Sequence, residues 1–474
     1  MQHQNYFKHF FTIGLGTLIN LLLGLITVPL LTRIVDPNEY GQLALFNVYS
    51  SIALMFFCLG LDQSLVRFYY DKTELMYKRA LFSFSIKTSL IVCLFSSVMF
   101  LFFVYRDIVR LDFNFEICFL LVANIFILII DRFVTLTVRL NYKSKLYSIC
   151  LILKKSLFVT IFLLLFYVYD NSLFSLCMAT IFSVLIPSLL AIYFTKHLLF
   201  FFQGNEKIPR KELFLFGFPF IFSLGITQLF NVVDKLFLSY FCSYADVGIY
   251  SSAFSILNIF SVIQLTFNSI WSSIRVEHYT KAQNDTAFFQ KSHFIITVIM
   301  FFLGINLILF RDVFSLILGE KYRFVVFIIP FLIFNPIMYT ISETTNIGID
   351  FAKKSYLHII VSIVSLVSNV LGNILLVPRY GCEGAALSTG FSYVVFFVFR
   401  TFFSLKYYYV DFHLIRFFVT TGVVVLFAFY ATFYKTDLIF FFLYFLCVVV
   451  IISMYYSTVK YLIYFILQKI HFYR

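Results

Sequence analysis

The stretch Gly60-Leu-Asp-Gln-Ser-Leu-Val-Arg-Phe-Tyr-Tyr-Asp71 places an acid, Asp62, and a base, Arg67, within or at the edge of an apolar run. A charged side chain near the middle of a bilayer costs roughly 2.5–3.5 kcal/mol on insertion scales, so such residues usually face a bundle interior or a hydrated cavity. The 474-residue chain is 61% hydrophobic and only 12% charged, whereas soluble proteins average about 25% charged residues. We therefore expect an all-α polytopic membrane protein with charges kept in its interior.

Apolar runs of about 20 residues, the length that crosses a bilayer, recur along the chain. They predict fourteen transmembrane helices, at about 10–32, 42–66, 80–105, 117–138, 146–169, 173–195, 216–239, 250–272, 292–310, 325–345, 355–377, 383–405, 417–434 and 438–459. The first follows Met1–Lys8 without a small-residue cleavage site, so we expect it to be retained as a span. An even number of spans places both termini on one side. The segments on the side of the termini hold about three times as many basic residues as the segments on the opposite side. This bias predicts that the termini are cytoplasmic, and it accounts for the net charge of +13.

Two turns indicate an internal repeat. Leu31-Thr-Arg-Ile-Val-Asp-Pro-Asn-Glu-Tyr-Gly41 aligns without a gap with Leu238-Ser-Tyr-Phe-Cys-Ser-Tyr-Ala-Asp-Val-Gly248. Six spans separate the turns, and an even number predicts parallel repeats related by an axis along the membrane normal. We expect lobes at 1–200 and 205–406, joined by a polar linker, with two peripheral helices in 407–474.

One predicted span, 250–272, carries the longest polar pattern. Polar side chains, with one Trp, recur every three or four residues at Ser251, Ser255, Asn258, Ser261, Gln264, Asn268, Trp271 and Arg275. Such a stripe should face water or a polar ligand, because amides and hydroxyls facing lipid would be unsatisfied; hydrogen bonding between helices is the alternative. The preceding span adds Asn231 and Lys235. Arg275 lies near the repeat-related position of Arg67.

Four acids lie within predicted spans or at their ends: Asp62, Asp131, Asp234 and Glu343. Each could bind or release a proton or Na⁺ during transport, because burial and nearby cations shift carboxyl pKa values in opposite directions. Asp131 is followed by Arg132, and neighbours on a helix point about 100° apart, so a structural ion pair between helices is the alternative for both. The sequence has no metal-binding, phosphate-loop or nucleophile motif. We expect no metal, no cofactor and no catalytic residue.

Several motifs together resemble a known family. They are Leu31-Thr-Arg33, Glu39-Tyr-Gly41, Gly60-Leu-Asp62, Arg67-Phe-Tyr69, Phe216-Gly-Phe-Pro219, Asp234-Lys235, Val247-Gly-Ile-Tyr250, Pro378-Arg-Tyr-Gly381 and Gly384-Ala-Ala386. The set is similar to bacterial polysaccharide repeat-unit flippases, the O-antigen and capsule exporters of the Wzx type, in the multidrug/oligosaccharidyl-lipid/polysaccharide exporter superfamily. The resemblance implies a multi-pass protein of the cytoplasmic (inner) membrane that moves undecaprenyl-pyrophosphate-linked oligosaccharides to the outer leaflet for O-antigen or capsular polysaccharide.

On this reading Arg67 and Arg275 receive the pyrophosphate and Lys235 helps it inward, since guanidinium donors match diphosphate oxygens. The polar residues Asn231, Asn258, Gln264 and Asn268 complete the expected substrate site. Both arginines could instead be ordinary positive-inside anchors. Expected partners are the lipid-linked oligosaccharide, membrane lipids and other polysaccharide assembly proteins, with no nucleic acid. Alternatives are a cation-coupled drug exporter, a lipid II flippase or, in another class, a membrane-embedded polysaccharide polymerase, which the short outer segments disfavour.

Overall fold

A computed structural model describes residues 2–107, 113–169, 172–196 and 208–472. These residues form α helices and one short 3-10 helix, with no strand among them. The all-α polytopic prediction is confirmed. Contacts divide the chain into two compact units, the first Met1–Thr27 with Glu39–Val232 and the second Val28–Asn38 with Val233–Arg474. The predicted lobe boundaries and their repeat symmetry stay predictions.

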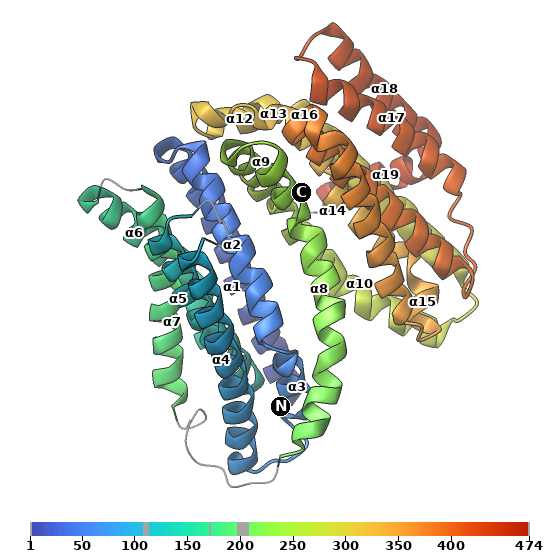
Figure 1. Cartoon of the computed structure of the whole chain (residues 1–474). Helices are drawn as coiled ribbons and strands as arrows, with labels where there is room; N and C mark the ends of the chain where they lie inside the picture. Colours follow the sequence, from blue (N-terminus) through green and yellow to red (C-terminus); the bar gives the residue numbers. More distant parts are fainter. Residues whose placement is uncertain (1, 108–112, 170–171, 197–207, 473–474) are drawn as a thin grey trace. The chain divides into compact units, whose positions relative to one another are not determined.

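Helices of the first unit are long because lipid offers backbone amides no partner, so each span must satisfy its own hydrogen bonds. The unit holds most of α1 (Gln2–Ile34) and α2 (Pro37–Phe57), then α3 (Leu61–Phe68), α4 (Leu75–Tyr105), α5 (Phe115–Leu140), α6 (Ser144–Val168), α7 (Ser172–Thr195) and the first part of α8 (Arg210–Phe241). The helices α4, α5, α6 and α7 pack successively on one another (Figure 1).

A break divides the predicted span 42–66 into α2 and α3. Leu59 and Gly60 have φ angles of 51° and 68°, in the left-handed region that ends a helix. A Cβ on Gly60 would lie 2.0 Å from the carbonyl oxygen of Gly217 in α8. Only glycine permits this contact between α3 and α8, and the break directs the start of α3 toward the interior of the unit.

The second unit holds Val28–Asn38, the remainder of α8 and the rest of the chain. Its helices are α9 (Tyr244–Leu257), α10 (Ile259–Lys281), α11 (Thr286–Leu309), α12 (Arg311–Ile317), η1 (Glu320–Tyr322), α13 (Val325–Leu332), α14 (Phe334–Thr345), α15 (Ile347–Phe351), α16 (Tyr356–Leu405), α17 (Leu414–Phe433), α18 (Leu438–Met454) and α19 (Tyr456–Phe472). The last two apolar helices, α17 and α18, run side by side (Figure 1).

The 50 residues of α16 would measure about 75 Å as one straight helix, over twice the ~30 Å bilayer core. Gly381 interrupts it with φ 53° and ψ −126°. Ser388 beyond the break donates to the carbonyl oxygen of Asn369 before it, at 2.7 Å. Thus α16 is a hairpin of two spans, as the sequence around Pro378 and Gly381 predicts.

Eleven helices of the described chain are long and apolar enough to cross a bilayer, or twelve if the bent pair α18 and α19 forms one span. The predicted fourteen is therefore approximate. One difference is that α16 contains two predicted spans. Another is that the predicted span 250–272 is divided at Asn258 into α9 and α10, and its polar stripe lowers its hydropathy.

Candidate functional site

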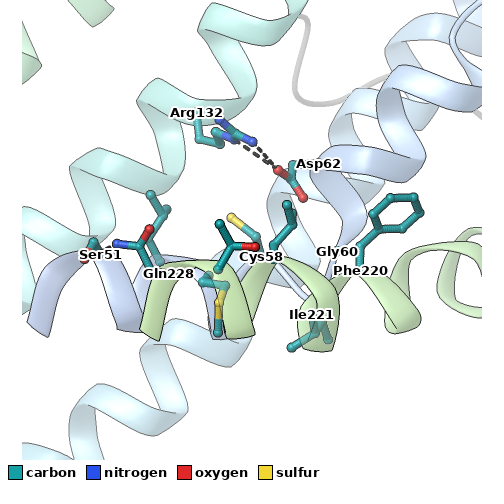
Figure 2. A pocket seen from close by; sticks show the side chains of 12 residues that line it. Ser51, Cys58, Gly60, Asp62, Arg132, Phe220, Ile221 and Gln228 are labelled. Atoms are coloured by element: carbon teal, nitrogen blue, oxygen red, sulfur yellow. Dashed lines mark hydrogen bonds and ion pairs between the residues drawn. The ribbon is translucent and has the colours of Figure 1, made fainter. Parts of the chain in front are cut away.

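A cavity of about 290 Å³ lies within the first unit, between α2, α3, α5 and the first part of α8. Its volume is near the lower end of small-molecule sites. The lining is mostly apolar, with a few polar groups, and comprises Ser51, Leu54, Met55, Cys58, Gly60, Asp62, Arg132, Phe220, Ile221, Leu224, Thr227 and Gln228. Across it Gln228 donates to the Ser51 hydroxyl at 3.0 Å (Figure 2).

An ion pair between α3 and α5 is the main charged feature of this cavity (Figure 2). The Nε and Nη2 atoms of Arg132 both donate to Oδ2 of Asp62, at 3.0 and 2.7 Å. Gln63 Nε2 donates to the same oxygen at 3.0 Å. The Asp62 side chain is only 7% exposed, whereas that of Arg132 is 42% exposed.

This asymmetry follows from the local fold. Asp62 lies in the first turn of α3, where the backbone N–H groups favour a negative charge. Arg132 is in α5 and reaches the cavity with a long side chain. No hydrogen bond of its Nη1 atom occurs in the part of the chain that the structure describes. Arg132 is therefore held by Asp62 through Nε and Nη2, and its Nη1 faces away from this ion pair without a hydrogen bond among the described residues.

Asp131, the neighbour of Arg132, finds different partners. Its carboxylate accepts from Lys154 Nζ at 2.6 Å and from the Ser188 hydroxyl at 2.8 Å. These contacts connect α5 with α6 and α7. The arrangement satisfies the carboxylate and acts as an interhelix tie.

Asp234 of α8 is buried in the second unit and accepts four hydrogen bonds. Tyr250 and Thr389 donate hydroxyls to Oδ2, both at 2.6 Å. Asn369 and Asn373 donate side-chain amides to Oδ1 at 3.1 and 2.8 Å. Asn373 Oδ1 is buried and has no hydrogen-bond partner in the part of the chain that the structure describes. A single carboxylate thus lies within a shell of neutral oxygen-bearing side chains from α9 and both halves of α16.

Lys235 follows Asp234 and is partly buried. In the described chain it makes no hydrogen bond and no ion pair. Asn231, one turn earlier, belongs to the first unit and is exposed. An unpaired ammonium in an apolar span is a candidate for ligand contact.

The two arginines predicted to clamp pyrophosphate differ in their surroundings. Arg67 is 56% exposed and pairs with Asp71 one turn away at 3.0 Å, an arrangement worth well under about 1 kcal/mol. Arg275 is 16% exposed, and its Nη1 contacts Asn346 at 2.8 Å and Asp350 at 2.7 Å. Burial would raise the pKa of Asp350, but its hydrogen bond with His358 and the charge of Arg275 lower it overall. Neither arginine lines the cavity of the first unit, and their joint action stays a prediction.

The polar stripe of the predicted span 250–272 lies partly on α9 and partly on α10. Asn258 is exposed, and Gln264 and Asn268 are partly buried; the side chain of Ser261 lies outside the described residues. Asn268 Oδ1 is enclosed and accepts no hydrogen bond from any described residue. At the far end, Trp271 Nε1 donates to the carbonyl oxygen of Glu343 at 2.9 Å. The last turns of the stripe therefore make contacts between helices.

Glu343, the remaining predicted coupling acid, forms an ion pair with Arg400 at 2.9 Å. Arg400 also donates to the Ser342 hydroxyl at 2.7 Å, and both charged side chains are largely buried. Among described residues, no group of three or more His, Cys, Asp or Glu side chains could hold a metal ion.

The sequence alone predicts no ligand role for Arg132, and it does not indicate the partners of Asp234, which are Tyr250, Asn369, Asn373 and Thr389. A signal existed for the asparagines, which lie four residues apart on one face of an apolar span. For Arg132 the partner is 70 residues away in sequence, and no local pattern indicates it.

A family model described as "Polysaccharide biosynthesis protein" matches residues 7–272. A search of curated proteins finds no match. Among solved structures, the lipid II flippase MurJ in an inward closed conformation is similar with a TM-score of 0.64 and 16% identity, covering 96% of this chain and 99% of that one. An inward-facing MATE multidrug resistance transporter of the MOP superfamily has a TM-score of 0.59 and 16% identity, and the match covers 82% of this chain and 94% of that one. A mutant of the Vibrio cholerae MATE transporter VcmN has a TM-score of 0.55 and 12% identity, and the match covers 85% of this chain and 97% of that one. These structures share the fold of this chain.

Proposed function

The chain belongs to the polysaccharide biosynthesis protein family, and we propose that it is a flippase for an undecaprenyl-pyrophosphate-linked oligosaccharide repeat unit. The proposal rests on the position of Arg132. Its guanidinium lines a cavity among apolar spans and is held there by the buried carboxylate of Asp62. A structural ion pair alone would not require one partner to stay open to the cavity.

The Asp62–Arg132 pair suits a diphosphate that arrives and departs. The two opposite charges leave the resting cavity close to neutral, which lowers the cost of charge within the membrane. A diphosphate oxygen can accept from the free edge of the guanidinium while Asp62 retains the other edge, and such charge-assisted bonds are among the stronger ones in proteins. Asp62 therefore orients Arg132 and also lowers the affinity of Arg132 for the diphosphate, which favours release of the substrate.

We assign the other predicted residues, each within its own unit, to contacts with the same substrate. Arg67, with a weak surface partner, is available for an approaching pyrophosphate. Arg275 must exchange its contact with Asp350 to take part, so it contributes less than Arg67. Lys235 provides an unpaired cation farther along α8, and the amides of Asn231, Asn258, Gln264 and Asn268 suit sugar hydroxyls. The glycan product is O-antigen or capsular polysaccharide, made at a bacterial cytoplasmic membrane with both termini inside.

Cation coupling is assigned to Asp234 rather than to Asp131 or Glu343, each of which already has a cationic partner. Hard cations prefer oxygen ligands. Rotation of the Asn369 and Asn373 amides would present their carbonyl oxygens beside the carboxylate and the Thr389 hydroxyl. The unpartnered Asn373 Oδ1 supports this site for Na⁺; protonation of Asp234 is the other coupling mode.

The test uses a strain in which this chain is the only source of repeat-unit transport. At matched expression, we expect Arg132→Ala to abolish surface polysaccharide and Arg132→Lys to reduce it strongly, because lysine lacks the paired donors. Lys145→Ala is the control, since Lys145 is a basic residue outside the cavity. Arg67→Lys and Arg275→Lys test the predicted clamp in the same strain. Full surface polysaccharide with Arg132→Ala would refute the proposed site.

A cation-coupled drug exporter is the second candidate, favoured by the similarity of the fold to MATE transporters. It predicts that expression lowers the sensitivity of a pump-deficient strain to cationic dyes, and that Asp234→Asn, at the assigned coupling acid, removes this protection. A flippase of anionic lipid-linked sugars predicts no protection. The two functions are therefore separated by one growth assay.

A further inference from the structure

A second pocket lies in the second unit. The segment between α16 and α17, together with the first turn of α17, lines this pocket, which is open on one side and has a volume of about 600 Å³. This volume lies within the range of small-molecule sites. Leu405 and Ile415 provide apolar walls, and Asp411, His413 and Arg416 provide polar ones.

The pocket lies at the depth of the lipid head groups. The spans α16 and α17 end and begin beside it, at Leu405 and Leu414. After α18 the chain bends by 90° into α19, and a helix perpendicular to a span runs along the membrane surface. The ring of Phe294 contacts Tyr455 at this bend, with centroids 5.8 Å apart, and His413 of the pocket at 5.6 Å. The bend and the pocket are therefore at one level.

The composition of α19 is consistent with a position at the depth of the lipid head groups. Tyr456, Ile463 and Leu467 are 63%, 53% and 54% exposed, so they require an apolar surrounding. Lys460 and Gln468 are exposed nearby on the helix. Lys460 lies on the same face as these three residues by helical spacing, and exposed apolar and tyrosine side chains with a lysine among them suit the membrane interface, where the lysine can reach the head groups.

Arg416 and Asp411 give the pocket one charge of each sign. Arg416 is exposed, and its guanidinium makes no hydrogen bond and no ion pair within the described ranges. Asp411 is 57% exposed; its Oδ1 accepts from the backbone N–H of His413 at 3.0 Å, and its Oδ2 lies 2.8 Å from Nδ1 of the same residue. That hydrogen bond, followed by the His413 side chain, lowers the pKa of Asp411. The carboxylate is therefore ionised at neutral pH.

We propose that this pocket binds the head group of a zwitterionic phospholipid, with the phosphate on Arg416 and a primary ammonium on Asp411. The acyl chains extend along Leu405 and Ile415 into the bilayer. An anionic head group would satisfy Arg416 but would lie beside the Asp411 carboxylate without a positive group to offset it. A choline head group cannot donate hydrogen bonds to Asp411.

The experiment measures lipid binding by native mass spectrometry of the full-length protein, delipidated in detergent. The probes are short-chain phosphatidylethanolamine, phosphatidylglycerol and phosphatidylcholine, added separately. We expect the ethanolamine lipid to bind most tightly. Arg416→Gln should weaken binding of all three at least about tenfold, the value of a charge-assisted hydrogen bond. Asp411→Asn should weaken only the ethanolamine lipid by a similar factor, and Lys354→Gln, an exposed and unpartnered control in the same unit, should change nothing.

Two results would overturn the proposal. One is equal or tighter binding of phosphatidylglycerol by the wild-type protein, which would assign the pocket to anionic lipids. The other is an unchanged ethanolamine preference in Asp411→Asn. Because the Asp411 side chain is itself exposed, this variant remains informative even if Arg416→Gln fails to fold. Neither outcome depends on oligosaccharide transport.

Discussion

Removing either partner of the Asp62–Arg132 pair should have unequal effects on stability. Arg132→Ala leaves a carboxylate that is 7% exposed and that keeps, among the described residues, only Gln63 as a donor; an uncompensated buried charge costs about 3–5 kcal/mol. Asp62→Ala leaves a guanidinium that is 42% exposed and can be hydrated from the cavity, so we expect a cost of about 1 kcal/mol. The double variant removes both charges and should be more stable than Arg132→Ala alone, by about 2 kcal/mol or more.

The assay is thermal unfolding in detergent, followed with a thiol-reactive dye. All eight cysteines are free and all except Cys242 are buried, so labelling reports loss of packing. Glu277→Ala and Lys281→Ala provide the matched control, because that exposed pair one turn apart should change stability by at most about 0.5 kcal/mol. Equal losses for Asp62→Ala and Arg132→Ala, or a double variant as unstable as the sum of both, would refute the assigned asymmetry.

Three further predictions concern other parts of the molecule. If Asp234 couples to Na⁺, NaCl should raise the unfolding temperature above that in choline chloride, and Asp234→Asn should remove the difference; the same rise in both proteins would contradict it. Gly60→Ala should disrupt folding because its Cβ would lie 2.0 Å from the Gly217 carbonyl oxygen, whereas Gly225→Ala meets only the end of Met55 at 3.1 Å; similar yields of both variants would refute this reading. The pKa of Asp350 is lowered in the folded protein, so its ion pair with Arg275 stabilises the protein above the unfolded carboxyl pKa of about 3.9 and loses this effect as the pH falls through the folded pKa. The destabilisation caused by Arg275→Ala should therefore be smaller near pH 3 than at pH 7. A destabilisation that is the same at both pH values would contradict this prediction.

The helical fold was predictable because composition and span length are local properties. The turn at Pro378–Gly384 also followed from its proline and glycines, and the structure places the reversal at Gly381. Two bends were not predictable. Tyr455, between α18 and α19, is a common span residue, and Cys58-Leu59 before Gly60 contains no turn signal. In both places tertiary packing determines where the helix ends.

The candidate site was only partly predictable. Asp62 and Asp234 were recognised because an acid in an apolar run is costly, and that argument needs no partner. Their partners depend on which helices pack together, and Arg132 and Thr389 lie 70 and 155 residues away from them. The sequence therefore indicates where charge must be stabilised but not which residues stabilise it.

Transport in proteoliposomes tests both the flippase activity and the role of Arg132. The purified protein is reconstituted with a fluorescent undecaprenyl-pyrophosphate-linked oligosaccharide, and the fraction accessible to an external membrane-impermeant quencher is followed over time. We predict that wild-type protein equilibrates the lipid between leaflets and that Arg132→Ala, with its folding verified, does not exceed protein-free vesicles. Absence of flipping by the wild-type protein, or a wild-type rate in Arg132→Ala, would contradict the account.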